Sequence, residues 1–362
     1  MKCSVDKEDF VVAQKAIKKI SPDTTSVYLK TNKEEGTLSL ISRGIYYINY
    51  IISADVEEEG VISLNRSLFD MLVFLRGKKL KMESINNSLQ ITCGSKVKLF
   101  CDEINEEEFA QPSIKNNKKV ILDSKAVGIF KQLINMVYFE SLAQSYEVPA
   151  RVESNSTGFH IRIADYVHCA FYSYKKQISD KDFCFTTYLK NLKDVVSLLS
   201  EKSKLLIDDS LMLLKSANIV TTLPFVQDSE TKEIDSALGF IDPSNYRKGK
   251  ITFDHEKLMT SLNSISVISE GVDLLRVDID KKVILSLKTS FGVSKDKISP
   301  INNSFTSIKL DLPLPMLNGA LSSSRLGEEV IFTLSTEGNY YKLYSEKDNF
   351  FCNCVAPVGG IK

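Results

Sequence analysis

The sequence predicts an α+β protein of three similar domains, each made of two helices packed on antiparallel sheets. Two observations support this prediction: a strand–helix–strand pattern recurs three times along the chain, and a second helical pattern precedes each occurrence. A chain of 362 residues is also too long for one ordinary hydrophobic core. Its 43% hydrophobic and 25% charged residues are typical of a soluble globular protein.

The first pattern begins with "VISLNRSLFDMLVFLRGKKLKMESINNSLQITCGSKVKLF", residues 61–100, and returns at 184–225 and 308–357. In each copy a strand leads into a helix, and a polar break and two alternating strands follow. The copies are about 125 residues apart, far above the period of about 20 to 50 residues in solenoid repeats, so each belongs to a separate domain. The apolar residues at helical spacing are Leu68, Leu72 and Leu75, then Leu192, Val196 and Leu199, then Leu314, Leu317 and Leu321.

The second pattern is a helix that begins just after an aspartate, in "VDKEDFVVAQKAIKKI", "LDSKAVGIFKQLINMV" and "FDHEKLMTSLNSIS". Asp6, Asp123 and Asp254 are placed to cap free backbone amides of these helices and to complement the helix dipole. The apolar residues that should face the core are Phe10, Ala13 and Ile17, then Val127, Phe130 and Ile134, then Leu258, Leu262 and Ile265.

Strand-like segments separate the two helices of each domain, in "GTLSLISRGIYYINYIISADV", "GFHIRIADYVHCAFYSYKKQ" and "LLRVDIDKKVILSLKTSFGV". The polar linkers "EINEEEFAQPSIKNNKK" and "VQDSETKEIDSALGFIDPSNYRKGK" then place the domains at residues 1–116, 117–242 and 243–362. The pattern alone leaves open whether the repeats serve a shared function or only record a duplication.

Charge and targeting signals restrict the possible functions. Lys+Arg and Asp+Glu both number 46, so a DNA-facing surface would need its positive charge gathered on one face. The N-terminal "MKCSVDKEDF" lacks the apolar run of a signal peptide, and no apolar stretch is long enough to cross a bilayer. The seven scattered cysteines predict free thiols in a reducing compartment. We therefore expect a cytoplasmic protein that does not bind membranes. A composition rich in Lys, Asn, Ser and Ile is typical of an AT-rich genome, and if that genome is viral we expect the protein in the host cytoplasm.

The sequence contains no recognisable catalytic pattern. The histidines His160, His168 and His255 are not spaced as metal ligands, and Cys352 and Cys354 have no partner CxxC pair. Phosphate-loop spacing of glycine and lysine is also missing. These features predict a protein that is not an enzyme and needs no metal or cofactor.

Three stretches carry a resemblance to a known family. "ISADVEEEGVISLNRSLFDML", residues 52–72, is similar to the family's "PAEVEEEG" segment and the strand and helix that follow it. "IADYVHCAFY", residues 163–172, lies at the site of the family's Thr-Asp-Gly-His-Arg-Leu-Ala element and keeps Asp165 and Ala170. The C-terminal "CNCVAPVGGIK" keeps Pro357 of the Met-Pro-Met-Arg-Leu tail. In length, domain number and half-domain order the whole chain resembles the bacterial-type DNA polymerase sliding clamp, the polymerase III β subunit, and a cellular or viral (phage) origin stays open.

The resemblance implies the DNA clamp fold: two chains form a head-to-tail homodimer ring, with helices around a hole for double-stranded DNA and sheets outside. Contacts to phosphates carry no sequence information, so such a ring can slide. Taken singly, each basic side chain is better explained by a solvated helix face than by a DNA contact, and the prediction rests on basic residues recurring on corresponding helices. The implied DNA-binding residues on the first and second helices of each domain are Lys15, Lys18, Lys19, Arg66, Arg76, Lys78, Lys79, Lys125, Lys131, Lys190, Lys193, Lys257 and Arg325.

The resemblance also implies two protein contacts. A groove for a short peptide of a DNA polymerase or clamp loader would lie between the second domain and the C-terminal tail. The implied groove residues are Val148, Ala164, Val167, His168, Cys169, Tyr246, Arg247, Val355, Pro357 and Val358, of which Cys169 and Val355 are equally compatible with ordinary strand core. Ring closure between two chains is implied to use Phe74, Leu75, Leu274, Leu275 and Val277, at least half of which we expect to be core instead.

Two further function classes stay open. One is a β-rich structural or scaffold protein of a virion that has repeated domains and does not encircle DNA. The other is an enzyme that uses His168 and Cys169, although neighbours along a strand point to opposite faces and cannot hydrogen-bond directly.

Overall fold

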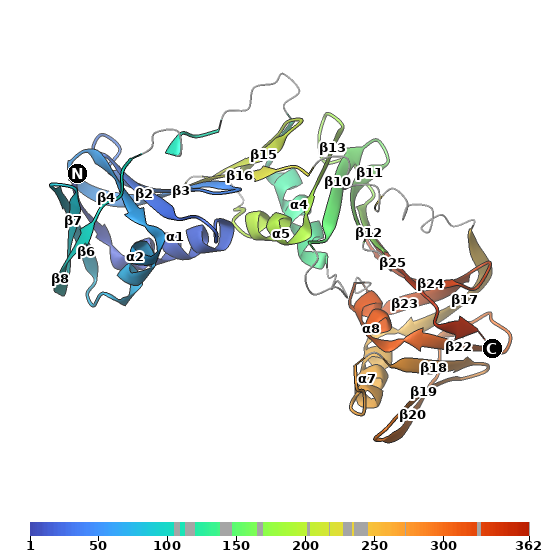
Figure 1. Ribbon diagram of the computed structural model, residues 1–362. Coiled ribbons are helices and arrows are strands. Elements are labelled where there is room, and N and C mark those ends of the chain that lie inside the picture. Colours follow the sequence, from blue (N-terminus) through green and yellow to red (C-terminus); the bar gives the residue numbers. More distant parts are fainter. Residues whose placement is uncertain are drawn as a thin grey trace. The chain divides into compact units, whose positions relative to one another are not determined.

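The computed structural model describes most of the chain, in two compact units (Figure 1). One unit is Met1–Gly128 with Asn191–Phe225, and the other is Ile129–Lys190 with Val226–Lys362. The described residues are 1–104, 109–112, 120–137, 147–164, 169–200, 203–216, 218–226, 234, 245–271, 273–323 and 327–361.

One element order, strand–helix–strand–strand–strand, repeats six times along the chain. The first two copies are β1 (Lys2–Asp6), α1 (Lys7–Ile20), β2 (Ser26–Asn32), β3 (Thr37–Arg43) and β4 (Tyr47–Glu58), then β5 (Gly60–Asn65), α2 (Arg66–Met71) with the 3-10 turn η1 (Leu72–Phe74), β6 (Lys79–Ile85), β7 (Ser88–Cys93) and β8 (Ser95–Phe100). The next two are β9 (Val120–Leu122), α4 (Ser124–Met136), β10 (Pro149–Asn155), β11 (Gly158–Ala164) and β12 (Cys169–Tyr174), then β13 (Phe183–Tyr188), α5 (Leu189–Val196), β14 (Lys204–Ile207), β15 (Leu211–Lys215) and β16 (Ile219–Pro224). The last two are β17 (Tyr246–Asp254), α7 (His255–Ser266), β18 (Leu274–Ile279), β19 (Val283–Thr289) and β20 (Gly292–Ile298), then β22 (Ile308–Pro313), α8 (Leu314–Ser323), β23 (Glu329–Ser335), β24 (Tyr340–Lys347) and β25 (Phe350–Pro357), with the two-residue strands β21 (Asn302–Asn303) and β26 (Gly360–Ile361).

The predicted α+β class is confirmed, and so are the three aspartate caps. A carboxylate oxygen of Asp6 accepts from the backbone N of Glu8 at 2.8 Å, and one of Asp254 accepts from the backbone N of Lys257 at 3.0 Å. Asp123 does the same for α4, whose Ala126 N lies 2.8 Å from its carboxylate. The nine apolar residues predicted to face the core from α1, α4 and α7 are all buried.

Three strands, not two, follow each helix of the recurring pattern, so that part of the prediction is wrong. The missed strand in the first copy is β8, which a single-residue turn at Gly94 separates from β7. Gly94 has φ 74°, and a Cβ there would lie 1.9 Å from the carbonyl oxygen of Arg76, so only glycine fits this turn. The alternation of β7 and β8 therefore reads as one strand in the sequence.

Every strand pairing among the described residues is antiparallel, and the β4–β16 and β12–β25 pairings join strands from different thirds of the chain. In the first unit the sheet runs β8-β7-β6-β1-β4-β16-β15-β14-β9, with β3, β2 and β5 branching from β4. In the second unit one sheet runs β13-β10-β11-β12-β25-β24-β23-β17-β21, and another runs β20-β19-β18-β22-β26. We call the β4–β16 and β12–β25 pairings the two sheet junctions.

The junctions divide the middle segment of the chain between the two units. Its strands β14 to β16 belong to the first unit and its strands β10 to β13 to the second. The three-domain division at 116 and 242 therefore stays a prediction. Within the described residues, no helix has the length and apolar character needed to cross a membrane.

Candidate functional site

The polar face of α1 carries three exposed lysines, Lys15, Lys18 and Lys19, opposite the buried residues that pack on the sheet. Lys19 is engaged within its own unit: its Nζ lies 3.3 Å from a carboxylate oxygen of Asp194 and 2.9 Å from the hydroxyl of Ser197. Lys15 and Lys18 point to solvent. They are long, flexible cations of the kind that contact phosphates without reading sequence.

The lysines of the other helices differ in exposure. Lys125 on α4, Lys190 on α5 and Lys257 on α7 are exposed, whereas Lys131 and Lys193 are half-buried. Burial lowers the pKa of Lys193. The Nζ of Lys257 lies 3.6 Å from the capping carboxylate of Asp254, an exposed ion pair that leaves the charge accessible. Arg325 lies outside the described residues.

The placement of Arg76, Lys78 and Lys79 on the second helix is wrong. That helix ends at Met71 and its 3-10 extension ends at Phe74, so Arg76 and Lys78 lie in the following turn and Lys79 opens β6. Gly77 has φ 148°, outside helical geometry, and so marks the break. All three cations are nevertheless exposed.

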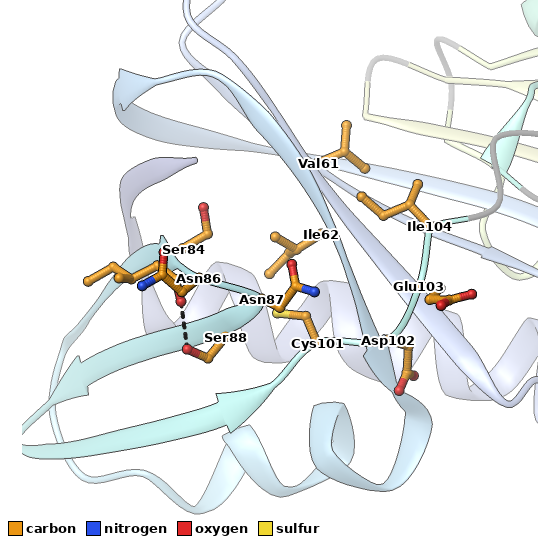
Figure 2. A pocket seen from close by; sticks show the side chains of 11 residues that line it. Val61, Ile62, Ser84, Asn86, Asn87, Ser88, Cys101, Asp102, Glu103 and Ile104 are labelled. Atoms are coloured by element: carbon orange, nitrogen blue, oxygen red, sulfur yellow. Dashed lines mark hydrogen bonds between the residues drawn. The ribbon is translucent and has the colours of Figure 1, made fainter.

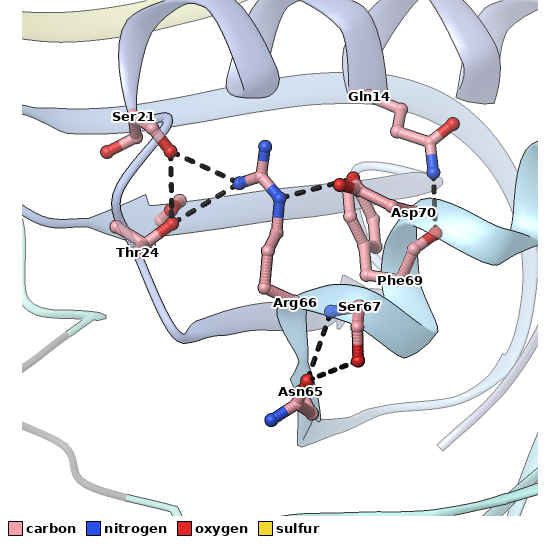
Figure 3. A network of polar contacts seen from close by, with 9 residues as sticks. Gln14, Ser21, Thr24, Asn65, Arg66, Ser67, Phe69 and Asp70 are labelled. Atoms are coloured by element: carbon pink, nitrogen blue, oxygen red, sulfur yellow. Dashed lines mark hydrogen bonds and ion pairs between the residues drawn. The ribbon is translucent and has the colours of Figure 1, made fainter.

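Arg66 is the clearest departure from the predicted DNA-binding set (Figure 3). The residue is only 9% exposed, and its guanidinium points inward. Nε lies 3.1 Å from a carboxylate oxygen of Asp70, and Nη1 donates to the carbonyl oxygen of Ser21 at 3.3 Å and to the hydroxyl of Thr24 at 3.2 Å. Arg66 therefore ties α2 to the end of α1, and we withdraw it from the proposed phosphate contacts.

Four residues predicted for the peptide groove come together in the second unit. Ala164, Cys169 and Val355 are buried in one apolar cluster, and Tyr246 packs against it half-buried. The register explains this meeting, because Cys169 lies opposite Ala164 on one side and Val355 on the other across β11, β12 and β25. We call these four residues, together with Ile234 and Tyr340, the tyrosine cluster.

Sequence reasoning missed two members of the tyrosine cluster, Ile234 and Tyr340. Tyr340 lies opposite Pro357 in the β24–β25 hairpin, so pairing these two strands in the sequence would have found it. Ile234 comes from the polar segment before β17, which the sequence predicts to be a linker between domains.

The other predicted groove residues lie outside the buried core of the tyrosine cluster or outside the described residues. Val148, Pro357 and Val358 are half-buried, and they are not part of the cluster's buried core. Val167 and His168 lie outside the described residues, as does the side chain of Arg247.

A lysine stands beside the tyrosine cluster. The Nζ of Lys342 lies 4.5 Å from the ring centroid of Tyr246 and 5.8 Å from that of Tyr344, distances at which a cation is attracted to the aromatic face. Burial raises the pKa of the Tyr246 hydroxyl, so the ring stays neutral beside this cation. An apolar floor with aromatic walls and one cation suits the apolar anchor of a short peptide.

The residues predicted to close the ring divide into two groups. Phe74 is 80% exposed and Leu274 53% exposed, and Leu75 is half-buried. Leu275 and Val277 are buried because alternate residues of β18 face the core, so their assignment to a contact between chains is wrong.

The first unit also contains a pocket of about 500 Å³ (Figure 2). Its acidic residues are Asp102 and Glu103, and burial together with the nearby Asp102 carboxylate raises the pKa of the Cys101 thiol. Among the described residues that line it there is no lysine, arginine or histidine, so this lining does not suit a phosphate. The lining residues are Val61, Ile62, Ser84, Ile85, Asn86, Asn87, Ser88, Cys101, Asp102, Glu103 and Ile104.

The sixfold element order, the sheet junctions and the tyrosine cluster together define the DNA clamp fold. The fold is shared over the whole length with solved β subunits of DNA polymerase III. The β chain from Streptococcus pneumoniae superposes with a TM-score of 0.82 at 18% identity, covering 99% of this chain and 100% of that one. The subunit β from Pseudomonas aeruginosa gives 0.80 at 14% identity, covering 99% of each chain. The Helicobacter pylori β clamp bound to a DNA ligase peptide gives 0.77 at 16% identity, covering 99% of this chain and 100% of that one.

The sequence itself matches no protein-family model and no curated protein. At identities this low, the structural likeness establishes the fold of the chain, and its function rests on the surfaces described above.

Proposed function

We propose that this protein is a DNA sliding clamp, a processivity factor that encircles double-stranded DNA and tethers a DNA polymerase. The observation that carries the proposal is the fold shared with polymerase III β subunits over 99% of the chain. Such a protein acts by binding and topology in the cytoplasm of the replicating cell, without catalysis or cofactor.

The proposed grip on DNA uses exposed lysines on the helices. Lys15, Lys18, Lys125, Lys190 and Lys257 are the members of the predicted set that the helices expose most clearly. Their contacts would be made to phosphates, which are the same at every step of the duplex, so no position on DNA is preferred. Retention then comes from closure of the ring around DNA, and intrinsic affinity can stay low.

The proposed ring joins the first predicted domain of one chain to the third domain of a second chain, edge to edge. Among the described residues, β8 pairs only with β7 and β20 only with β19, so each has one free edge. Exposed Phe74 and Leu274 are proposed to lie in the apolar contact beside these edges.

The tyrosine cluster is the proposed binding site for a short peptide of the polymerase or the clamp loader. Support comes from its aromatic walls, Tyr246 and Tyr340, and from the register that brings Cys169 and Val355 together. A few buried anchors carry most of the binding energy in such sites, so Tyr340→Ala is expected to weaken peptide binding at least tenfold. Lys281→Ala changes an exposed residue that is not part of the tyrosine cluster, and as the control it should leave peptide binding unchanged.

Retention on DNA tests the proposal as a whole. The protein is incubated with nicked circular plasmid, a bacterial clamp-loader complex and ATP, and the mixture is passed over a large-pore gel filtration column. A clamp co-elutes with the circle and is lost when the circle is cut by a restriction enzyme. Equal retention on circular and linear DNA would rule out encirclement.

The two other function classes receive less support. A virion scaffold gives no reason for a fold shared from end to end with polymerase clamps. Cys169 is only 3% exposed and lies inside an apolar cluster, an unsuitable place for a nucleophile.

A further inference from the structure

The two free edges proposed to close the ring carry the same sign of charge. On β8, Lys96 and Lys98 are both exposed and, being two residues apart, project from the same face of the sheet. Their neighbours on β7 are the uncharged Thr92 and Gln90. The strand sequence "SKVKLF" contains no carboxylate.

The edge strand β20 repeats this arrangement. Lys295 and Lys297 are exposed on one face, next to the exposed Val293. The intervening Asp296 faces the other way, where the Ser261 hydroxyl of α7 donates a hydrogen bond to its carboxylate. That hydrogen bond lowers the pKa of Asp296, whose negative charge is thereby held on the helix side of the sheet.

Edge-to-edge pairing would bring these two lysine pairs together. Helices pack on one face of each sheet, α7 against β20 and α1 against β1 and β4 of the sheet that ends in β8, so a continuous sheet places the open faces of β8 and β20 on the same side. Side chains directly opposite one another on paired strands are about 5 Å apart, and like charges in such pairs are destabilising. Lysines on free edges are a common protection against unwanted strand pairing.

We propose that closure of the ring between two copies of this chain is opposed by the lysines on β8 and β20, so that self-association is weak at low ionic strength and tightens as salt is raised. This inference rests on the proposed ring. The screening length falls from about 10 Å at 0.1 M salt to about 3 Å at 1 M, so the repulsion between these exposed lysines weakens steadily as salt is raised. Exposed Phe100 at the end of β8 and Phe291 before β20 supply apolar surface that salt does not weaken.

A charge-reversal cycle tests the proposal on the full chain. Sedimentation velocity measures the dimer dissociation constant at 25 mM and 300 mM NaCl for the natural protein, for K96E/K98E, for K295E/K297E and for the variant with all four changes. Either double variant turns both interfaces of the ring from repulsive to attractive, and we expect about tenfold tighter dimers at 25 mM NaCl. The fourfold variant restores like charges, so its dimer should be as weak as that of the natural protein.

Matched controls separate this effect from a general change of charge. K204E/K215E makes the same change at two exposed lysines that lie opposite each other on β14 and β15, strands with partners on both sides, and it should leave the constant unchanged. All six changed positions are exposed, and circular dichroism melting verifies that every variant is folded.

The outcomes distinguish this inference from the proposed function. A natural dimer that is tight at 25 mM and loosens with salt, or a fourfold variant as tight as the double variants, overturns the lysine proposal and leaves the ring standing. Absence of a dimer in every variant at both salt concentrations overturns the ring, and with it both proposals.

Discussion

The strands of the sheet junctions are paired within the chain, whereas among the described residues the free edges of β8 and β20 are unpaired, and the two kinds of strand differ in their charged residues. The β12–β25 junction pairs Cys169–Tyr174 with Phe350–Val355, and neither segment contains a charged residue. The paired residues of the β4–β16 junction, such as Tyr50 and Ile219, are uncharged as well. The free edges β8 and β20 carry two exposed lysines each. A strand that is always paired can be apolar throughout, whereas one that must stay open needs charge to prevent indiscriminate pairing.

The largest effect should follow from giving a junction the character of a free edge. Cys354 on β25 is fully buried opposite Ala170, so Cys354→Lys places an uncompensated charge in the core. We expect a loss of about 4 kcal/mol in the free energy of unfolding, measured by urea denaturation. The reverse change at the open edge, Lys98→Ile, should alter the free energy of unfolding by less than about 0.5 kcal/mol. Equal losses of unfolding free energy in the two variants would show that the sheet junction and the free edge do not differ in their tolerance of charge.

Cations show the same division between buried and open positions. Arg66→Ala removes three hydrogen bonds of a charged group and leaves Asp70 without its partner. We expect a loss of about 2 kcal/mol in the free energy of unfolding. Lys18→Ala on the exposed face of α1 is the matched control and should cost less than about 0.5 kcal/mol. A stable Arg66→Ala protein with weakened DNA binding would instead return Arg66 to the phosphate contacts.

The strand beside the β12–β25 junction should make that junction sensitive to acid. His160 on β11 is buried, with its ring nitrogens 2.9 Å from the hydroxyls of Thr157 and Ser173. Burial, helped by the nearby Arg162 charge, lowers the pKa of His160. Since the unfolded chain then binds more protons, the contribution of His160 to stability is present above about pH 6.5 and is lost as the pH falls below it.

Thermal unfolding at pH 7.5 and pH 5.5 measures this effect. The natural protein should lose more melting temperature between the two pH values than His160→Gln, which cannot be protonated in this range. An equal loss in both proteins would mean that other groups set the acid sensitivity.

The smallest effect is expected for the open lysines of α1, because each contributes one exchangeable phosphate contact. Lys15→Ala combined with Lys18→Ala should reduce the slope of log affinity against log salt by about two for linear duplex, with no loss of fold stability. Fluorescence anisotropy over a salt series measures the slope. An unchanged slope would remove α1 from the proposed DNA-facing surface.

Local features of the fold could be predicted from the sequence because they depend on neighbouring residues. Asp6, Asp123 and Asp254 each cap the helix that follows within three residues, and the apolar residues of α1, α4 and α7 repeat at helical spacing. The strand register places Cys169 opposite Val355, two residues that the resemblance to clamps assigned to one groove, and their role in that groove stays a prediction.

Features set by distant parts of the chain could not be predicted in this way. In the sequence, a cation at the start of a helix looks like a solvent-facing residue. Arg66 is buried instead because it donates hydrogen bonds to Ser21 and Thr24, which lie more than forty positions earlier in the chain. Leu275 and Val277 were assigned to a contact between chains because a sequence does not tell which residues of β18 face the core. Single-residue turns such as Gly94 hide a strand boundary.

The most direct test of encirclement is the salt dependence of the lifetime on DNA. A ring closed around a nicked circle should dissociate slowly, and no faster at 1 M than at 0.1 M NaCl, and should leave linear DNA within seconds at either concentration. A protein held by phosphate contacts alone would lose its hold on the circle as steeply with salt as on linear DNA. Equal, strongly salt-dependent lifetimes on the two forms of DNA would contradict the clamp.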